Sequence, residues 1–505
     1  MRLFGFFGAA ALCVVGVPAA ADNAQGSGHV VAAWSQFVPG STAPANPVAP
    51  PSIELRFVVD AVSNANSSAC DSFVLAYRDQ GGNQGLASAG KPRANPDSQA
   101  FPVTTCATLL DAGWSDVQLI AARQQPGAAP VTIWDNGVDT GISVVVPGPH
   151  AIGRRHQDDQ GNPELLIATL GDSGCRGGTD QDCQSDWPFQ AITQSAAAQQ
   201  PDLFVHTGDY RYYRQSDTTK RWEYWLKDLL VPARTALLAA PWALARGNHE
   251  TCDFGRSGMG FTFLFGVNGA NCSVVIEPSW HFDVAPGGFD SAGQAVLPHR
   301  FVMIDSSNEG LPPPPGLTPA FSDAIDQSAS DSVWWVTHVP PVHLLNYGGK
   351  TRPSNPDVLS QLAQAVAAKG PLCTATANGG SQCRPSVILL GHDHLFQSVT
   401  FPNAAGQFDW PQVYVVGHGG VDLRSAKLRA EACTYQFPGL PGVAGTRRGI
   451  VNTREGHGFV LWRRSAQTAA EPSGWIADPR DASGTPWAPF AAATRACLND
   501  TVRSR

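Results

Sequence analysis

The 505-residue sequence contains 11 cysteines but no C-x-x-C pair. Structural zinc sites usually depend on such closely spaced thiolates, so this class of metal site is disfavoured. No run of more than two Lys or Arg residues occurs, and the formal net charge is −8 at pH 7. Because the chain lacks a basic patch, nucleic acid is not an expected partner. No apolar run of about 18 residues follows the N-terminal segment, so no membrane-spanning helix is expected.

Residues 1–21 have the pattern of an export signal. Arg2 gives a positive start, Leu3 to Val17 is apolar, and Ala19-Ala20-Ala21 offers a cleavage site before Asp22. The apolar part is too short to span a bilayer comfortably. We therefore expect a soluble, exported protein that is either secreted or periplasmic.

Removal of this segment also removes Cys13 and leaves ten cysteines, an even number. In an exported protein such cysteines are expected to form disulfides. The sequence does not determine their connectivity. The simplest pairing joins near neighbours: Cys70/Cys106, Cys175/Cys183, Cys252/Cys272, Cys373/Cys383 and Cys433/Cys497.

Residues 22–150 are predicted to form a β-rich N-terminal domain. The first part, to about residue 52, is rich in Ala, Pro and Ser, apart from the apolar stretch Val30 to Val38. Short strands separated by turn residues then favour a small β-sandwich. The candidate strands are Ile53–Asp60, Phe73–Arg78, Val117–Arg123, Val131–Trp134 and Ile142–Val146.

Residues 151–465 show a different pattern, in which strands alternate with helices. This alternation predicts a layered α/β domain. The expected strands are Glu164–Leu170, Leu203–Thr207, Trp242–Ala245, Val302–Ile304, Val333–Val336, Val387–Leu390, Val413–Val416 and Phe459–Trp462. The expected helices are Asp186–Gln199, Thr219–Ala239 and Pro356–Ala368. Residues 466–505 are predicted to form a loop-like tail, tied back by Cys497.

Five short segments with polar side chains follow apolar strands in this second region. They are Gly171–Gly174, Gly208–Tyr212, Gly247–Glu250, Val336–His338 and Gly391–His394. In layered α/β sheets, ligands gather beyond the carboxyl ends of the strands. The segments supply two Asp, one Tyr, one Asn and three His, which is enough for two metal ions that share a ligand. Such a pair of ions can clamp both oxygens of a displacement at phosphorus.

Two of these residues suggest a particular chemistry for the oxygen ligands. Tyr212 can bind as phenolate only to a strongly polarising cation, and a hard trivalent ion such as Fe(III) fits best. The alternative is that Tyr210, Tyr212 and Tyr213 form a packed aromatic cluster. Asn248 offers a neutral oxygen that suits a divalent ion.

The histidines differ in how strongly they indicate a metal site. His249 follows Asn248 directly and is better placed to donate a proton to the substrate than to bind the same ion. His338 stands alone at a strand end, where a structural role is the commoner one. His392 and His394 lie two residues apart, which puts both side chains on one face of an extended segment.

Taken together and in this order, the five segments resemble the motifs of purple acid phosphatases within the calcineurin-like metallophosphoesterase superfamily. Those motifs are Gly-Asp-x-Gly, Gly-Asp-x-x-Tyr, Gly-Asn-His-Glu, Val-x-x-His and Gly-x-His-x-His. In this chain the fourth differs, because Val336 stands two residues before His338 instead of three. Most of the superfamily has a His where this chain has Gly174. The resemblance implies a four-layer α/β/β/α fold, preceded here by the β-sandwich-like domain.

The resemblance also implies a ligand set for two ions. It assigns Asp172, Asp209, Tyr212 and His394 to Fe(III). It assigns Asp209, Asn248, His338 and His392 to a divalent ion (Fe, Zn or Mn). His249 and Asp209 are the expected catalytic residues.

Three further residues are candidates for binding the substrate phosphate. Purple acid phosphatases often carry histidines shortly after the fourth motif, and here only His343 is near. Arg176 and Arg211 are additional basic candidates, with a surface or buried ion pair as the alternative for both. His206 and His418 are expected to be structural.

The predicted activity is hydrolysis of small-molecule phosphate monoesters by a metal-bound hydroxide, as in an acid phosphatase. One alternative is a phosphodiesterase or nucleotide pyrophosphatase that uses the same site. An alternative of another class is an exported glycan- or wall-binding protein with a structural metal site. The sequence leaves the natural substrate and the oligomeric state open.

Overall fold

The computed structural model describes residues 28–498, except 40–51, 62–67, 160, 162, 177–180, 213–220, 253–256, 270–271, 273–274, 285–297, 309–315, 330–331, 348–349, 376–380, 404–406 and 466–474. The predicted signal segment, residues 1–21, and Tyr213 lie outside the described residues. Within the described residues, no helix is long and apolar enough to cross a membrane.

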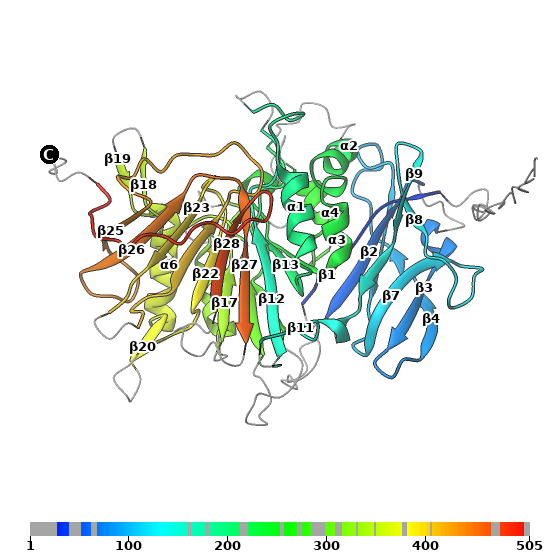
Figure 1. The fold of residues 1–505 in the computed structure, drawn as a ribbon, viewed down its shortest axis with the longest axis horizontal. Helices are drawn as coiled ribbons and strands as arrows, with labels where there is room; N and C mark the ends of the chain where they lie inside the picture. Colours follow the sequence, from blue (N-terminus) through cyan, green and yellow to red (C-terminus); the bar gives the residue numbers. More distant parts are fainter. Residues whose placement is uncertain are drawn as a thin grey trace, which may run out of the picture.

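Two large sheets form the centre of the molecule (Figure 1). The ten-stranded sheet has the order β28-β27-β12-β13-β14-β1-β2-β6-β5, and β11 pairs with β12. Its strands are β1 (Val30–Phe37), β2 (Ile53–Val59), β5 (Lys91–Pro92), β6 (Thr104–Leu109), β11 (His156–Gln157), β12 (Pro163–Leu170), β13 (Leu203–His206), β14 (Trp242–Leu244), β27 (Gly458–Ser465) and β28 (Ile476–Asp481).

The second large sheet has eight strands in the order β15-β16-β17-β22-β24-β23-β26-β25. They are β15 (Trp280–Val284), β16 (His299–Met303), β17 (Val333–Val336), β22 (Val387–Leu390), β23 (Phe396–Thr400), β24 (Gln412–Val416), β25 (Ala432–Pro438) and β26 (Thr446–Arg454). Two hairpins stand apart from it: β18 (Leu345–Tyr347) with β19 (Lys350–Arg352), and β20 (Cys373–Ala375) with β21 (Ser381–Cys383).

Helices cover the outer face of each large sheet. Apolar side chains of α1 (Phe189–Ala198), α2 (Arg221–Trp225), α3 (Arg234–Ala239) and α4 (Gly258–Leu264) pack on the ten-stranded sheet. Those of α5 (Thr318–Gln327) and α6 (Pro356–Lys369) pack on the eight-stranded sheet. A third apolar cluster fills the space between the sheets, with Ile167 on one side and Trp334 on the other. The predicted α/β/β/α architecture is confirmed.

The N-terminal strands form a sandwich that is continuous with the large sheet. Strand β1 pairs in parallel with β14, so β1, β2, β6 and β5 extend the ten-stranded sheet. A four-stranded sheet packs on this extension through buried residues such as Phe57, Leu75 and Leu119. Its strands are β3 (Phe73–Asp79), β4 (Gln84–Ser88), β7 (Trp114–Ala121) and β10 (Val145–Pro147), and β8 (Thr132–Asp135) and β9 (Val138–Ser143) form a separate hairpin. The sequence-based domain boundary at residue 150 stays a prediction.

Some predicted elements differ from the observed ones. Val30–Phe37, part of the apolar stretch for which no element was predicted, is a mostly buried strand. Ile142–Val146 is divided between β9 and β10. The C-terminal tail, expected to be loop-like, contains β28, which pairs with β27 along its length. All five disulfides join the near neighbours proposed from the sequence, including Cys433 with Cys497.

Candidate metal centre

The five polar segments follow parallel strands in both large sheets. Strands β12, β13 and β14 are neighbours in the first sheet, and β17 and β22 are neighbours in the second. Parallel neighbours end at the same edge of a sheet, which brings the residues after them together. All seven predicted ligands lie in the loops that follow these strands.

The first cluster of donor atoms contains Asp172, Tyr212 and His394. The Tyr212 hydroxyl donates to Asp172 Oδ1 at 2.9 Å and lies 3.4 Å from His394 Nε2. His394 Nε2 is 3.7 Å from the same Asp172 oxygen. All three side chains are buried or nearly so. One carboxylate, one phenol and one imidazole, the side chains expected to hold the trivalent ion, therefore lie close together.

The second cluster contains Asp209, Asn248, His338 and His392. Asn248 Oδ1 lies 2.9 Å from His338 Nε2 and 3.3 Å from His392 Nδ1. His338 Nε2 is also 3.3 Å from Asp209 Oδ2. These are the four residues predicted to hold the divalent ion.

The two clusters lie side by side. Ligand atoms of Asp172, Asp209 and His338 are all within 4.8 Å of one another, although the three residues belong to three different loops. Two ions can therefore sit close together, with Asp209 near both positions. Carboxylate, phenol, amide and imidazole atoms suit a trivalent and a divalent ion of intermediate hardness, so the residues fit the implied pair.

The backbone at this site adopts unusual conformations. Asp172, Asp209 and His392 have φ values of 53°, 59° and 71°, in the left-handed region that residues other than Gly rarely adopt. Such conformations cost about 1–3 kcal/mol each and cluster at functional sites. Gly391 is needed for the close packing, because a Cβ there would lie 2.5 Å from an Asp172 carboxylate oxygen.

Glu250 holds two of the loops together. It is fully buried, and its carboxylate accepts the backbone N–H groups of Gly247, Asp209 and Tyr210 at 3.0 to 3.2 Å. The carboxylate therefore orients Asp209 and the Asn248 turn together. The sequence pattern contains Glu250, but its spacing gives no indication of this bracing role.

Each of two imidazoles is oriented through its second ring nitrogen. His338 Nδ1 lies 2.8 Å from the Thr207 carbonyl, and His394 Nδ1 lies 2.9 Å from the Asp422 carbonyl. A carbonyl can only accept a hydrogen bond, so Nδ1 carries the proton in both rings. The Nε2 atoms are then left as the ligand atoms.

The acidic groups of the site have shifted pKa values, because they lie buried and close together where cations would bind. Burial raises the pKa of Asp172 to about 8, with a smaller contribution from Asp209, although His338 opposes the shift. Burial and then Asp172 raise the pKa of the Tyr212 phenol well above its usual value. Burial alone would also raise the pKa of Asp209, but His338 and His249 hold it below its usual value. Without ions, some of these groups keep protons that a metal ion would replace.

Two of the three candidate histidine ligands favour the neutral form. Burial lowers the pKa of His392 to about 4 and keeps the pKa of His394 well below its usual value. For His338, burial opposes protonation, but the nearby Asp209 carboxylate raises its pKa to about 10. The proton that the raised pKa keeps on His338 occupies the place of a cation.

His249 lies beside the two clusters without joining either. Its ring centroid is 4.5 Å from that of Tyr212, and the ring is only partly buried. Its backbone N–H donates to Asp209 Oδ1 at 2.9 Å. The imidazole therefore lies next to the candidate ligands and is partly accessible to solvent.

The three predicted phosphate-binding residues have different surroundings. Arg176 is partly exposed, with its guanidinium 5.9 Å from the Tyr212 ring centre and 3.9 Å from Asp422. Arg211 is 1% exposed and pairs with Asp228 at 3.3 Å, which is the buried ion pair given as its alternative. His343 is also buried, and its Nδ1 contacts the Asp393 carboxylate. Only Arg176 lies on the open side of the site.

One cation near the site was not singled out from the sequence. Arg424 is exposed, and its backbone N–H donates to the His394 carbonyl at 2.8 Å. It follows the Gly417–Gly420 loop, whose His418 is fully buried. His206 is also buried, and its Nε2 contacts Ser173 Oγ at 2.9 Å, in keeping with a structural role.

Comparisons with protein families and solved structures found proteins similar to this chain. Residues 165–396 match the family model described as calcineurin-like phosphoesterase. A purple acid phosphatase from yellow lupin (Lupinus luteus) seeds is similar in structure over 94% of this chain and 78% of its own, with 12% identity and a TM-score of 0.54. PhoD is similar over 93% of this chain and 94% of its own, with 11% identity and a TM-score of 0.45. A search of the curated proteins found no match. At 12% identity, the likeness to the lupin enzyme shows a shared fold.

Proposed function

We propose that this chain, which carries a calcineurin-like phosphoesterase domain, hydrolyses phosphate monoesters at a centre of two metal ions. The observation that carries the proposal is the division of seven donor side chains into two adjacent clusters. Asp172, Tyr212 and His394 would hold a ferric ion, and Asn248, His338 and His392 would hold a divalent ion of Fe, Zn or Mn. Asp209 would contact both.

Such a pair of ions polarises the phosphoryl group and provides a nucleophile from water near neutral pH. The protein's own residues do the rest. Glu250 and the Thr207 carbonyl orient Asp209 and His338, so the site does not have to reorganise during the reaction. His249 would donate a proton to the leaving oxygen, and Arg176 would contact the phosphate from the solvent side.

Two other functions would also require a metal site of this kind. A phosphodiesterase or nucleotide pyrophosphatase would have the same ligands but a wider approach to them. A glycan- or wall-binding protein would use the metals only for structure, and Asn248 argues against this because a neutral amide oxygen is a weak structural ligand. The five disulfides support a secreted or periplasmic location.

Metal analysis combined with two substrates tests the proposal. We expect about two ions per chain, and faster hydrolysis of p-nitrophenyl phosphate than of bis-p-nitrophenyl phosphate. A preference for the diester would favour the phosphodiesterase, and bound metal without hydrolysis of either would favour the binding protein.

The visible spectrum tests the ferric ion separately. A phenolate bound to Fe(III) should give a charge-transfer band, which makes the oxidised protein purple or pink. Tyr212→Phe should remove the band, whereas Tyr210→Phe should keep it, because the Tyr210 hydroxyl donates to the Ala245 carbonyl at 2.9 Å instead. Ferric protein without a band would exclude Tyr212 as a ligand.

A further inference from the structure

We propose that three side chains of the N-terminal β-rich region, Gln36, Arg56 and Arg93, position the Asn248–Glu250 turn of the metal centre through helix α4. These residues act at one end of α4, and the turn contacts the other end. The inference rests on the proposed function for its activity readout. Its other readouts, ion binding and backbone exchange, do not.

Three side chains of the N-terminal region donate to carbonyls at the C-terminal end of α4. Arg56, which is 1% exposed, donates to the carbonyls of Leu264 and Gly266 at 2.6 and 3.1 Å. Arg93 donates to the carbonyls of Thr262, Phe263 and Gly266 at 2.9 to 3.0 Å, and Gln36 donates to that of Phe265 at 3.0 Å. The last carbonyls of a helix lack partners within the helix, and cations there also suit the helix dipole.

The N-terminal end of α4 contacts the metal-site turn. Ser257, directly before the helix, donates to the His249 carbonyl from its backbone N–H at 3.1 Å and from its hydroxyl at 3.0 Å. The same hydroxyl lies 3.3 Å from Glu250 Oε1, and the Gly258 N–H donates to the Thr251 carbonyl at 3.1 Å. Glu250 is the residue that orients Asp209. A displacement of α4 would therefore move both the Asn248 turn and its brace.

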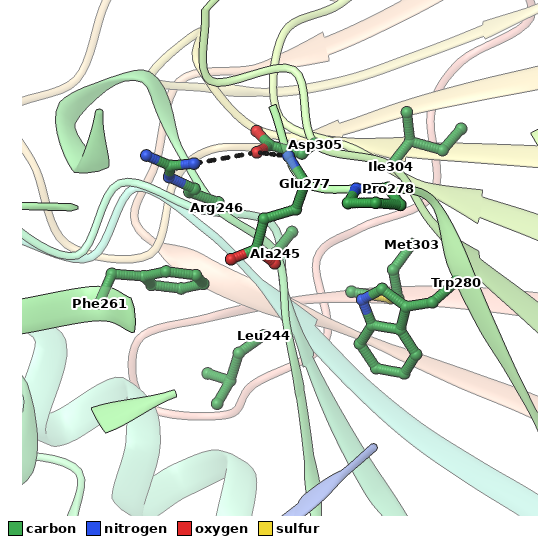
Figure 2. A pocket seen from close by; sticks show the side chains of 10 residues that line it. All are labelled: Leu244, Ala245, Arg246, Phe261, Glu277, Pro278, Trp280, Met303, Ile304 and Asp305. Carbon is green, nitrogen blue, oxygen red and sulfur yellow. Dashed lines mark hydrogen bonds and ion pairs between the residues drawn. The ribbon is translucent and has the colours of Figure 1, made fainter. Parts of the chain in front are cut away.

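Buried charged residues also connect the N-terminal region and α4 with the Asn248–Glu250 turn. Figure 2 shows the Arg246–Asp305 pair, 3.1 Å apart, beside a small cavity into which the Glu277 carboxylate extends between Phe261 and Trp280. Arg246 also donates to the Glu250 carbonyl at 2.7 Å. Glu277 interacts electrostatically with both Arg246 and Arg93. Since Phe261 belongs to α4 and Arg246 contacts the turn, residues around the cavity connect the helix with the turn, and Glu277 connects them with Arg93 through its charge.

These contacts give the N-terminal region a specific role. Arg56 is buried, and a buried guanidinium is costly unless its donors are satisfied. Here its partners are carbonyls of one short helix, together with Glu54. General stabilisation of the fold would not require two arginines, one in β2 and one in the loop after β5, to converge on this helix end.

The test is Arg93→Gln in the full-length protein. Changes in groups that support metal ligands typically cost about 10- to 100-fold in metal affinity or activity. We expect kcat for p-nitrophenyl phosphate to fall about tenfold with KM nearly unchanged, and binding of the divalent ion to weaken by a similar factor. Backbone amides of Gly247–Thr251 should exchange hydrogen faster. Arg93→Lys, which keeps the charge, should recover part of each effect.

Arg300→Gln is the matched control. Arg300 also donates to the last residue of a helix, the Gln327 carbonyl of α5 at 3.0 Å, and pairs with Asp283. Helix α5 supplies no ligand of the metal centre. This variant should lose thermal stability but keep kcat, ion affinity and the exchange of Gly247–Thr251.

Ser257→Ala tests the path itself. If α4 transmits the effect, adding Ser257→Ala to Arg93→Gln should lower kcat by less than the product of the two single effects, because both changes break one connection. Equal behaviour of Arg93→Gln and Arg300→Gln in kcat, ion affinity and exchange would overturn the proposal. If Arg93→Gln does not fold, Arg93→Lys takes its place, and wild-type values for Arg93→Lys and Ser257→Ala would also overturn it. A wild-type protein without phosphatase activity but with faster exchange in Arg93→Gln would count against the proposed function only.

Discussion

The two large sheets bring different ligand atoms to the metal centre. Loops of the ten-stranded sheet supply the oxygen atoms, from Asp172, Asp209, Tyr212 and Asn248. Loops of the eight-stranded sheet supply only imidazoles. Each predicted ion position has ligands from both sheets, so ions bound there would also join the two sheets.

The ligand atoms from the ten-stranded sheet (the oxygen side) and those from the eight-stranded sheet (the imidazole side) also differ in their charge before an ion binds. The oxygen side gathers acidic groups in a buried place, where the pKa values of Asp172 and Tyr212 are raised. The imidazole side is mostly neutral, and carbonyls fix two of its rings. Under the proposed assignment, the first side would supply the charge that attracts ions, and the second would fix the direction of its ligand atoms.

The largest effect is expected from removing one charge on the oxygen side. Asp209→Asn keeps the shape of the side chain but weakens the ligand near both ions, and turnover should fall to background with the fold retained. Asp202→Asn is the control, because Asp202 is also a fully buried carboxylate but accepts the Leu166 and Gly153 N–H groups away from the site. It should lose stability of about 1–3 kcal/mol and keep kcat. Normal turnover of fully loaded Asp209→Asn would refute the assigned site.

The convergence of the candidate ligands was predictable because each lies in a segment that follows an apolar strand, and strand ends converge in this kind of sheet. Glu250 was visible in the pattern, but its bracing role depends on N–H groups of another loop, about forty residues away in sequence, which spacing cannot reveal. The contacts of Arg56 and Arg93 with α4 join still more distant segments. Strand β28 was missed because its residues, Ile476–Asp481, are mostly polar and lack alternation, and its pairing with β27 decides the structure.

A smaller loss of activity is expected from His249→Ala, because His249 is not a predicted ligand of either ion. Proton donation by a positioned side chain is typically worth 10²–10⁴-fold, so kcat should fall by about this factor. The ion content should stay near that of the wild type, since the His249 ring lies outside both clusters of donor atoms. Loss of one ion from the variant would instead make His249 a ligand.

After metal removal, the buried titratable groups of the site should make the stability of the folded protein depend on pH. Burial raises the pKa of both Asp172 and Glu250 to about 8, and His338, next to Asp209, has its pKa raised to about 10 despite its burial. Groups with raised pKa values stabilise the folded state below their unfolded pKa, and this stability is lost as the pH rises through the folded value.

The ion-free protein should therefore become less stable between pH 7 and pH 9. The expected slope is about 1.4 kcal/mol per pH unit for each proton that only the folded state holds. In the loaded protein the cations replace these protons, so the slope should be smaller. Urea unfolding of both forms at the two pH values measures the difference, and parallel slopes would contradict the assignment of the charge to this site.

The smallest effect on activity is expected for the two arginines that flank the oxygen side. Arg176 pairs with Asp422 at 3.9 Å while partly exposed, and such surface pairs contribute about 0–1 kcal/mol to stability. If Arg176 contacts the substrate phosphate, Arg176→Gln should raise KM by about three- to tenfold, equivalent to about 0.7–1.4 kcal/mol, with thermal stability unchanged. Arg211→Gln should do the opposite, because it leaves the buried Asp228 without its partner and costs about 3–5 kcal/mol while KM stays the same. Measured together, the two variants separate a substrate contact from a buried ion pair, and a wild-type KM for Arg176→Gln would return Arg176 to its alternative role as a surface ion pair.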